Sequence, residues 1–219
     1  MALSRITVLI SGRGSNLAAL IDHARAGNVA GAVTHVVSNR PDAGGLALAR
    51  DAGIATSVVD HLAQGSRDAF DDALTAAVEA TEPDLIVLAG FMRVLRADFV
   101  RRHSGRIINV HPSLLPLYPG LHTHRRALAD GVRIHGCSVH YVTPDIDVGP
   151  IIAQGAVPVL AGDDEATLAA RVLEVEHRLL PAAVEWHCAG RLVVEDGCVR
   201  VRDDAATDGE RALLVPFPR

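Results

Sequence analysis

The sequence predicts an α/β protein with a doubly wound, mainly parallel sheet that carries helices on both faces. Short, β-branched apolar runs alternate with helical patterns through the first half of the chain. These runs are almost continuously apolar, as strands are when helices cover both faces of a sheet. The chain has 219 residues, of which 49% are apolar, so one large core is expected.

The predicted strands of the first half cover residues 6–11, 33–38, 55–59, 85–89 and 106–110. The helical patterns between them cover residues 16–26, 45–52, 67–80 and 97–103. After a proline-rich segment, the sequence predicts a short helix at 124–130, strands at 137–142 and 151–159, and a long helix at 164–189. A final hairpin at 192–201 would turn at Asp196-Gly197.

The sequence contains no internal repeat and no linker rich in Gly, Ser or Pro. We therefore expect a single domain over residues 1–201, followed by a loosely structured tail at 202–219. Its N-terminal half would span about residues 1–105 and its C-terminal half about residues 106–201.

All 21 basic residues are arginine, so chemistries that need a lysine are excluded in their standard form. These include the Walker-type phosphate loop, the pyridoxal-phosphate Schiff base and the protein-kinase site. A net charge of −5 and only 3% aromatic residues argue against a nucleic-acid partner. We expect no membrane association, because the long uncharged run at residues 148–162 is interrupted by proline and glycine. Three cysteines without a Cys-x-x-Cys pair, and no signal segment, indicate the reducing cytoplasm.

The most informative segment is Asn-Val-His-Pro-Ser-Leu-Leu-Pro at residues 109–116. Pro112 keeps His111 out of the α region, so His111 should stand where the strand leaves the sheet. Residues two apart on a strand project to the same side, within roughly 7 Å of each other. Asn109 and His111 would therefore offer a hydrogen-bond donor and a titratable ring to one space. That pairing suits a tetrahedral, oxyanion-forming reaction, although both side chains could instead only satisfy loop backbone.

Gly12-Arg13-Gly14-Ser15-Asn16 joins the first predicted strand to the first helix and is expected to bind a phosphate through backbone N–H groups. A dinucleotide is less compatible with this loop, because Leu17 replaces the third glycine of the G-x-G-x-x-G pattern. A tight glycine turn without a ligand is the alternative. Arg40 leaves an NADP-dependent reductase open.

Three further features could complete a binding site. Residues 91–95 follow a strand and are apolar except for Arg93, so they could line a slot for a flat heterocycle or simply fill the core. Asp147 lies before a Gly-Pro turn, where its carboxylate could approach His111, fix the tautomer of the ring and favour its protonated form. Glu176 interrupts an apolar stripe of the long helix, which indicates either a salt bridge or a ligand contact.

No metal site is predicted. His122 and His124 lack further ligands at a suitable spacing, and the same holds for His135 and His140.

Taken together, these motifs closely resemble the phosphoribosylglycinamide formyltransferase family, over about residues 5–200. The resemblance rests on residues 10–16 as a phosphate loop, residues 88–93 as a folate-pocket segment, and residues 109–116 with 118–124 as a catalytic signature. It implies a Rossmann-like formyltransferase fold. It also implies that the protein transfers a formyl group from the co-substrate 10-formyltetrahydrofolate to glycinamide ribonucleotide in purine biosynthesis, as a monomer or homodimer and without a metal.

The resemblance also implies roles for individual residues. The catalytic residues would be Asn109, His111 and Asp147. The ribonucleotide would be bound by Gly14, Ser15, Asn16 and Glu176. The folate would be bound by Arg67, Met92, Arg93, Val94, Leu95, Asn109, Thr143, Pro144, Asp145, Ile146 and Asp147.

The chain departs from the family pattern at Val148, where a glycine is frequent, and at Leu173, where a polar contact to the ribonucleotide is known. Two related enzymes are alternatives. One is a formyltetrahydrofolate deformylase, which would usually carry an N-terminal regulatory domain. The other is a methionyl-tRNA formyltransferase, which would need a C-terminal RNA-binding domain. A noncatalytic nucleotide sensor and an NADP reductase are the alternatives from other classes.

Overall fold

The computed structural model describes residues 3–27 and 29–202, so all but the first residue of the predicted tail at 202–219 lies outside the described residues. Its centre is a seven-stranded sheet with the order β3-β2-β1-β4-β5-β6-β7. Five strands run parallel, namely β1 (Ser4–Ile10), β2 (Gly31–Ser38), β3 (Ala55–Val58), β4 (Leu85–Leu88) and β5 (Ile107–His111). The predicted fold class is therefore confirmed.

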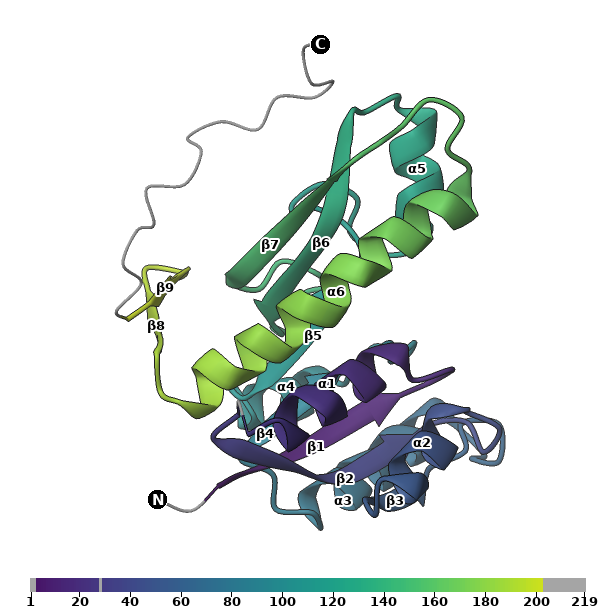
Figure 1. The fold of residues 1–219 in the computed structure, drawn as a ribbon. Coiled ribbons are helices and arrows are strands. Elements are labelled where there is room, and N and C mark those ends of the chain that lie inside the picture. The colour runs from purple at the N-terminus through teal and green to yellow at the C-terminus, as the bar shows by residue number, and fades with distance from the viewer. Residues whose placement is uncertain (1–2, 28, 203–219) are drawn as a thin grey trace.

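The last two strands of the sheet, β6 (Ile134–Tyr141) and β7 (Ile151–Pro158), run antiparallel to their neighbours. They extend the sheet beyond β5 and lie above the parallel strands in Figure 1. A separate two-stranded hairpin of β8 (Leu192–Glu195) and β9 (Cys198–Val201) confirms the predicted hairpin.

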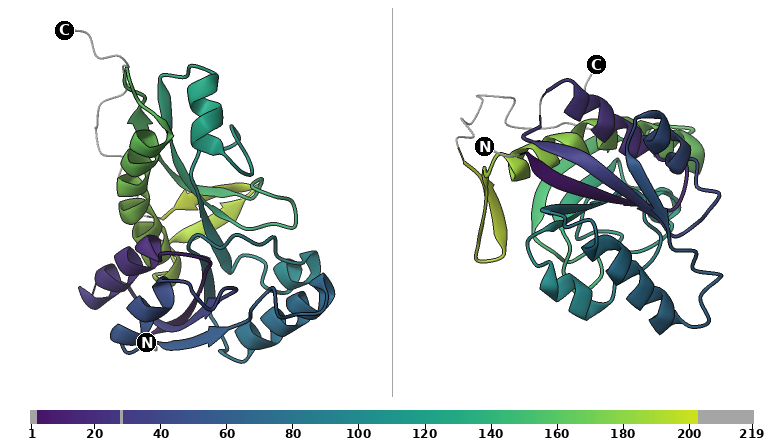
Figure 2. Two further views of the ribbon diagram at one scale, coloured as in Figure 1. Left: turned by 90° about the vertical axis from the view of Figure 1, so that its right-hand side faces the viewer. Right: turned by 90° about the horizontal axis from the view of Figure 1, so that it is seen from below.

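Helices cover both faces of the sheet, and the view from below separates the two layers (Figure 2). One layer contains α1 (Ser15–Arg25), α2 (Gly45–Asp51) and α6 (Glu165–Cys188), and the other contains α3 (Arg67–Glu79) and α4 (Ala97–Arg102). A short helix, α5 (Thr123–Ala129), packs against α6. The longest helix, α6, begins with a capping box in which Asp164 and Thr167 exchange hydrogen bonds.

Alternation along the strands divides the core in two. Ile6, Val8 and Ile10 of β1 pack in the cluster beneath α1, α2 and α6, whereas Leu9 packs on the opposite face beneath α3 and α4. The same alternation in β5 places Ile107 on the α3 and α4 side. Asn109 and His111 follow at intervals of two, so they project to that side as well.

The order of the parallel strands reverses between β1 and β4, and in such sheets ligands bind outside the carboxyl ends of the strands at this point. The loops after β1, β4 and β5 all leave the sheet at this edge. The fold thus brings together the three segments that the sequence marks as chemically informative. In the described residues, no helix is long and apolar enough to cross a membrane.

Candidate active site

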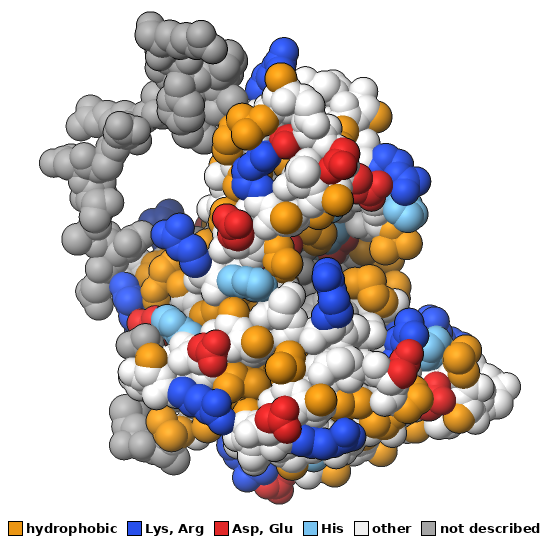
Figure 3. Space-filling view, turned by 45° about the vertical axis from the view of Figure 1, so that its right-hand side comes forward, with side chains coloured by type: hydrophobic (Ala, Val, Ile, Leu, Met, Phe, Trp, Pro, Cys, Tyr) orange, Lys and Arg blue, Asp and Glu red, His pale blue; other side chains and the backbone are white. Residues whose placement is uncertain are grey.

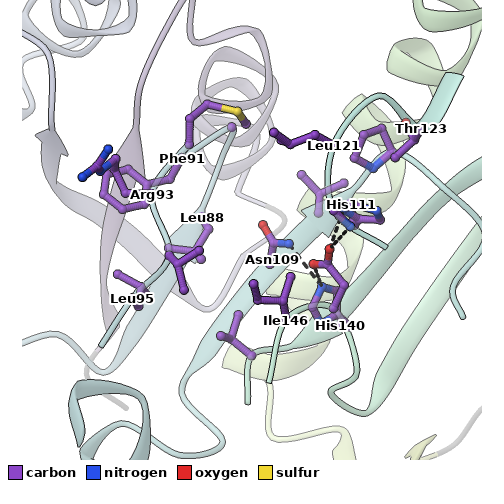
Figure 4. A pocket seen from close by; sticks show the side chains of 18 of the residues that line it. Leu88, Phe91, Arg93, Leu95, Asn109, His111, Leu121, Thr123, His140 and Ile146 are labelled. Carbon is purple, nitrogen blue, oxygen red and sulfur yellow. Dashed lines mark hydrogen bonds and ion pairs between the residues drawn. The ribbon is translucent and has the colours of Figure 1, made fainter. Parts of the chain in front are cut away.

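Asn109 and His111 stand at the end of β5, between β4 and β6, and their side chains line one cavity. His111 is the last residue of the strand, as its position before proline predicts. It is buried, with 6% of its surface exposed. Figure 4 shows both side chains directed toward the same group of polar residues.

The ring of His111 is held from two sides. Nε2 lies 2.9 Å from the carbonyl oxygen of Tyr118, and since a carbonyl only accepts, Nε2 carries a proton. Nδ1 lies 3.4 Å from Oδ2 of Asp147. Both ring nitrogens therefore face oxygen acceptors. The Nδ1 contact is longer than a strong hydrogen bond, so Nδ1 is the ring nitrogen more open to a ligand in the cavity.

Asp147 reaches His111 from the loop between β6 and β7. Its backbone is left-handed, with φ 56°, and its Oδ2 accepts a 2.8 Å hydrogen bond from the N–H of Gly120. Aspartate is among the few residues that tolerate this conformation. Val148 is 65% exposed, so its side chain turns away while Asp147 is only 11% exposed. The departure at Val148 therefore leaves the approach of Asp147 to His111 intact.

His140 contacts Asn109 in this site, a position that the sequence did not predict. Its Nδ1 donates to the carbonyl oxygen of Tyr141 at 2.9 Å, so in the neutral ring Nε2 is an acceptor. Nε2 lies 3.1 Å from Nδ2 of Asn109 and 3.7 Å from Oδ1 of Asp147 (Figure 4). Burial lowers the pKa of His140, which favours that neutral ring. The Asn109 amide is thereby oriented with its nitrogen toward His140, and its second N–H stays available.

One signal could have located His140. In the antiparallel register of β5 and β6, Asn109 is directly opposite His140, and an antiparallel partner for β5 would have placed them together. The direction of β6 does not follow from its apolar pattern, so this pairing was not predictable.

The cavity beside these residues has a volume of about 620 Å³. Most of the residues predicted to bind the folate line this cavity, namely Met92, Arg93, Val94, Leu95, Asn109, Thr143, Pro144, Asp145, Ile146 and Asp147. Arg93 lies at the opposite end from His111 (Figure 4). Met92, Val94 and Ile146 are more than half exposed, which makes an apolar rim. Hydrophobic side chains are visible around the hollow on the right of Figure 3.

Arg67 is the exception among the predicted folate contacts, because it is not part of the cavity lining. It stands at the start of α3, where its NH2 group donates to the carbonyl oxygen of Val94. Arg67 is thus one residue removed from the cavity wall, at the rim. The spacing of the motifs could not place this side chain.

A smaller cavity of about 120 Å³ lies at the start of α1, lined by Gly12, Arg13, Gly14, Ser15, Asn16, Ala89 and Gly90. Gly90 lines the large cavity too, so the two sites adjoin. Gly14 is the N-cap of α1 and has φ 82°, a conformation that favours glycine. A Cβ at this position would lie 2.6 Å from the Cα of Gly45.

The predicted phosphate loop therefore forms a cradle at a helix N-terminus. Ser15 is the first residue of α1.

Asn16, which lines this small cavity, contacts Glu176 although the two are 160 residues apart. Nδ2 of Asn16 donates to Oε2 of Glu176 at 2.7 Å, and both residues are buried. Burial raises the pKa of Glu176, while the hydrogen bond from Asn16 opposes that shift. Of the two alternatives for Glu176, the structure therefore shows no salt bridge but an amide partner, and the ligand contact stays a prediction. Oδ1 of Asn16 is buried and has no partner within the described part of the chain.

The remaining histidines near the site do not form a metal centre. His124 and His135 approach each other, with 3.2 Å between Nδ1 and Nε2, and burial lowers the pKa of His135 to about 4. Among residues 3–27 and 29–202, no group of three or more His, Cys, Asp or Glu side chains is arranged to hold a metal ion.

The site thus consists of two polar side chains at the end of a strand, an apolar cavity beside them, and a glycine turn at a helix N-terminus. The family model described as "Formyl transferase" matches residues 4–184. The chain therefore belongs to the formyl transferase family.

Within this family, the chain is an enzyme of the phosphoribosylglycinamide formyltransferase group, as its similarity to two such proteins shows. It is 48% identical to phosphoribosylglycinamide formyltransferase of Escherichia coli, over 94% of both chains. The crystal structure of glycinamide ribonucleotide transformylase 1 from Symbiobacterium toebii superposes with a TM-score of 0.89 at 48% identity, covering 92% of this chain and 95% of the other. A formyltetrahydrofolate deformylase structure from Pseudomonas syringae is more distant, at 26% identity and a TM-score of 0.85, covering 92% of this chain and 66% of the other.

Proposed function

We propose that this enzyme transfers the formyl group of 10-formyltetrahydrofolate to the primary amine of glycinamide ribonucleotide, a step of purine biosynthesis. One observation carries the proposal. Asn109, His111 and Asp147 stand at the end of a large apolar cavity, which adjoins a small anion cradle at Gly90. A folate and a phosphorylated amine could therefore meet at the same polar group.

The large cavity suits the folate. An apolar slot of several hundred Å³ with few polar groups is typical of a site for a flat heterocycle. Residues 92–95 would form one wall and residues 143–147 the other. Between these walls, the N10-formyl group would approach Asn109 and His111.

The small cavity suits the phosphate of the ribonucleotide. The backbone of Gly14 and Ser15, at the positive end of the α1 dipole, would bind the phosphate oxygens. The unpaired Oδ1 of Asn16 would accept from a ligand hydroxyl, and Glu176 would fix the Asn16 amide. Glu176 thus serves the ribose side of the site. Leu173 supplies no polar group there.

The chemistry begins with attack of the ribonucleotide amine on the formyl carbon, which forms a C–N bond and a tetrahedral oxyanion. The free N–H of Asn109 and the Nδ1–H of His111 would stabilise the oxyanion. Asp147 would take the proton from the attacking nitrogen and, through water, deliver it to N10. The C–N10 bond then breaks, releasing formylated ribonucleotide and tetrahydrofolate.

We further propose that the enzyme works in the cytoplasm as a monomer or homodimer, with no metal, nucleic acid or membrane as partner. The negative net charge and the three free cysteines support this proposal.

A thermal-shift screen tests ligand class. We expect glycinamide ribonucleotide and a folate each to raise the melting temperature, and NADPH to leave it unchanged. Stabilisation by NADPH alone would contradict the proposal and favour a reductase.

A further inference from the structure

Asp71 of α3 is a buried carboxylate that the proposed reaction does not use. Its side chain is 6% exposed, among the apolar residues beneath α3. Oδ2 accepts a 2.8 Å hydrogen bond from Nε of Arg67, one helical turn earlier. Oδ1 is buried and has no hydrogen-bond partner among the described residues. A buried carboxylate with one oxygen left unpaired is unfavourable to the fold, so its presence calls for a functional reason.

Arg67 is held in place by two contacts. Nε binds the buried Asp71, and NH2 binds the carbonyl oxygen of Val94 on the cavity wall. Its side chain is still 46% exposed. The guanidinium is therefore fixed at the rim of the large cavity, with one edge directed to solvent.

A second guanidinium stands nearby. Arg93, which lines the cavity, lies over the ring of Phe70 with its Cζ 5.5 Å from the ring centroid, and Phe70 precedes Asp71 on α3. Two arginines thus stand at this end of the site, and Arg67 is the one paired with the buried carboxylate. On the other wall, Asp145 and Asp147 carry negative charge. An anionic group of a ligand is accordingly favoured on the arginine side.

The neighbouring Asp72 shows what an ordinary surface pair on this helix looks like. Its side chain is 68% exposed and binds Arg96 at 2.6 Å. Exposed pairs of this kind contribute little to stability. Stability alone would place the partner of Arg67 in such an exposed position, where desolvation is small. The burial of Asp71 instead removes freedom from the Arg67 side chain.

We propose that Asp71 is a positioning residue that holds the Arg67 guanidinium ready for a carboxylate of the glutamyl tail of the folate. This inference rests on the proposed folate binding. The planar guanidinium binds carboxylates through paired hydrogen bonds, which require a fixed orientation. Asp71 supplies that orientation without touching the ligand.

The test compares two formyl donors, 10-formyltetrahydrofolate and 10-formyltetrahydropteroate, which lacks the glutamyl group. In Asp71→Asn, we expect KM for the folate to rise about tenfold, as for the loss of one charge-assisted contact, with kcat changed less than about twofold. KM for the pteroate should stay at the wild-type value. Asp72→Asn, the matched surface control, should leave both KM values unchanged. In an Arg67→Ala background, Asp71→Asn should add no further effect.

Equal increases of KM for both donors would overturn the proposal, because Asp71 would then act on the cavity wall as a whole. An unchanged KM for the folate, or a further loss on top of Arg67→Ala, would overturn it too. If Asp71→Asn does not fold, Asp71→Glu keeps the charge, displaces it, and serves the same comparison. Should the wild-type enzyme form no formylated ribonucleotide, the reaction proposal fails. Calorimetric dissociation constants for the two donors would still decide the role of Asp71.

Discussion

At the scale of single residues, two histidines of the site differ because their surroundings differ. His111 faces a carbonyl and a carboxylate, so its ring is surrounded by acceptors. His140 is buried next to the amide of Asn109, so it acts as the acceptor. One ring is thus suited to donate to a developing oxyanion, and the other to hold the second donor in place.

Removal of either oxyanion donor is the first prediction. We expect Asn109→Ala and His111→Ala to lower kcat roughly 10²–10³-fold, the usual effect of losing one such donor. The dissociation constant for glycinamide ribonucleotide should change little, because its phosphate binds elsewhere. Steady-state kinetics and calorimetry check the two parts, and a near-normal kcat in His111→Ala would refute the assignment.

Asn16→Asp gives the second prediction. The new carboxylate would lie where the amide nitrogen is now 2.7 Å from Glu176, and it would stand beside the phosphate of the ribonucleotide. Repulsion from both should weaken ribonucleotide binding at least about tenfold. Calorimetric titration measures this, and an unchanged affinity would exclude Asn16 from the site. Folate binding provides the internal control.

At the scale of elements, the loops were harder to predict than the strands. The parallel strands could be predicted because their continuous apolar runs reflect burial on both faces. The direction of β6 and β7 could not, since two-sided burial looks the same for either direction. The Gly120 N–H and Tyr118 carbonyl that hold the active site come from irregular backbone, which follows from no side-chain pattern.

The distance between Asp147 and His111 could not be predicted from the sequence either. Its sequence position suggested a loop carboxylate, and its left-handed backbone brings that carboxylate to His111. Arg67 shows the reverse, because it is set back at the cavity rim. Motifs could mark these residues as chemically informative, but only the folded loops fix their distances.

The turn between β1 and α1 gives the third prediction. Gly14→Ala would force a Cβ to within 2.6 Å of the backbone of Gly45 at a positive φ, so we expect a loss of about 1–3 kcal/mol in the free energy of unfolding. Gly12→Ala, whose Cβ would meet nothing within 4 Å, is the matched control and should change it far less. Urea denaturation measures both. Equal stabilities for the two variants would contradict the close approach of α1 and α2.

At the scale of the whole molecule, buried histidines link stability to pH. Burial lowers the pKa of His35, His103, His124, His135, His140 and His187. In the unfolded chain these rings take up protons near the ordinary value of 6.5. Below that pH the unfolded state binds more protons than the folded state, so the free energy of unfolding falls as the pH falls.

The fourth prediction follows from this sign. Between pH 7.5 and 5.5, the fully buried His135 and His140 alone should lower the free energy of unfolding by about 1–3 kcal/mol. The raised pKa of Glu176 increases the free energy of unfolding as the pH falls, but this single carboxyl group is outweighed by the several histidines. Urea titrations at the two pH values measure the change, and a stability that is constant or higher at pH 5.5 would contradict it.

The two adjoining cavities are the feature of the whole molecule on which the proposed reaction depends. They offer a formyl donor and an amine acceptor a common boundary at Gly90, close to the polar residues at the end of β5. A deformylase would need no phosphate cradle, because its acceptor is water. The acceptor therefore distinguishes the two related activities.

The most direct test of this account is the fate of the formyl group when 10-formyltetrahydrofolate is supplied with glycinamide ribonucleotide in water. The account predicts that formylated ribonucleotide and tetrahydrofolate form in equal amounts, with negligible formate, and that little turnover occurs without the ribonucleotide. Formate as the main product, at a rate that the ribonucleotide does not change, would contradict it.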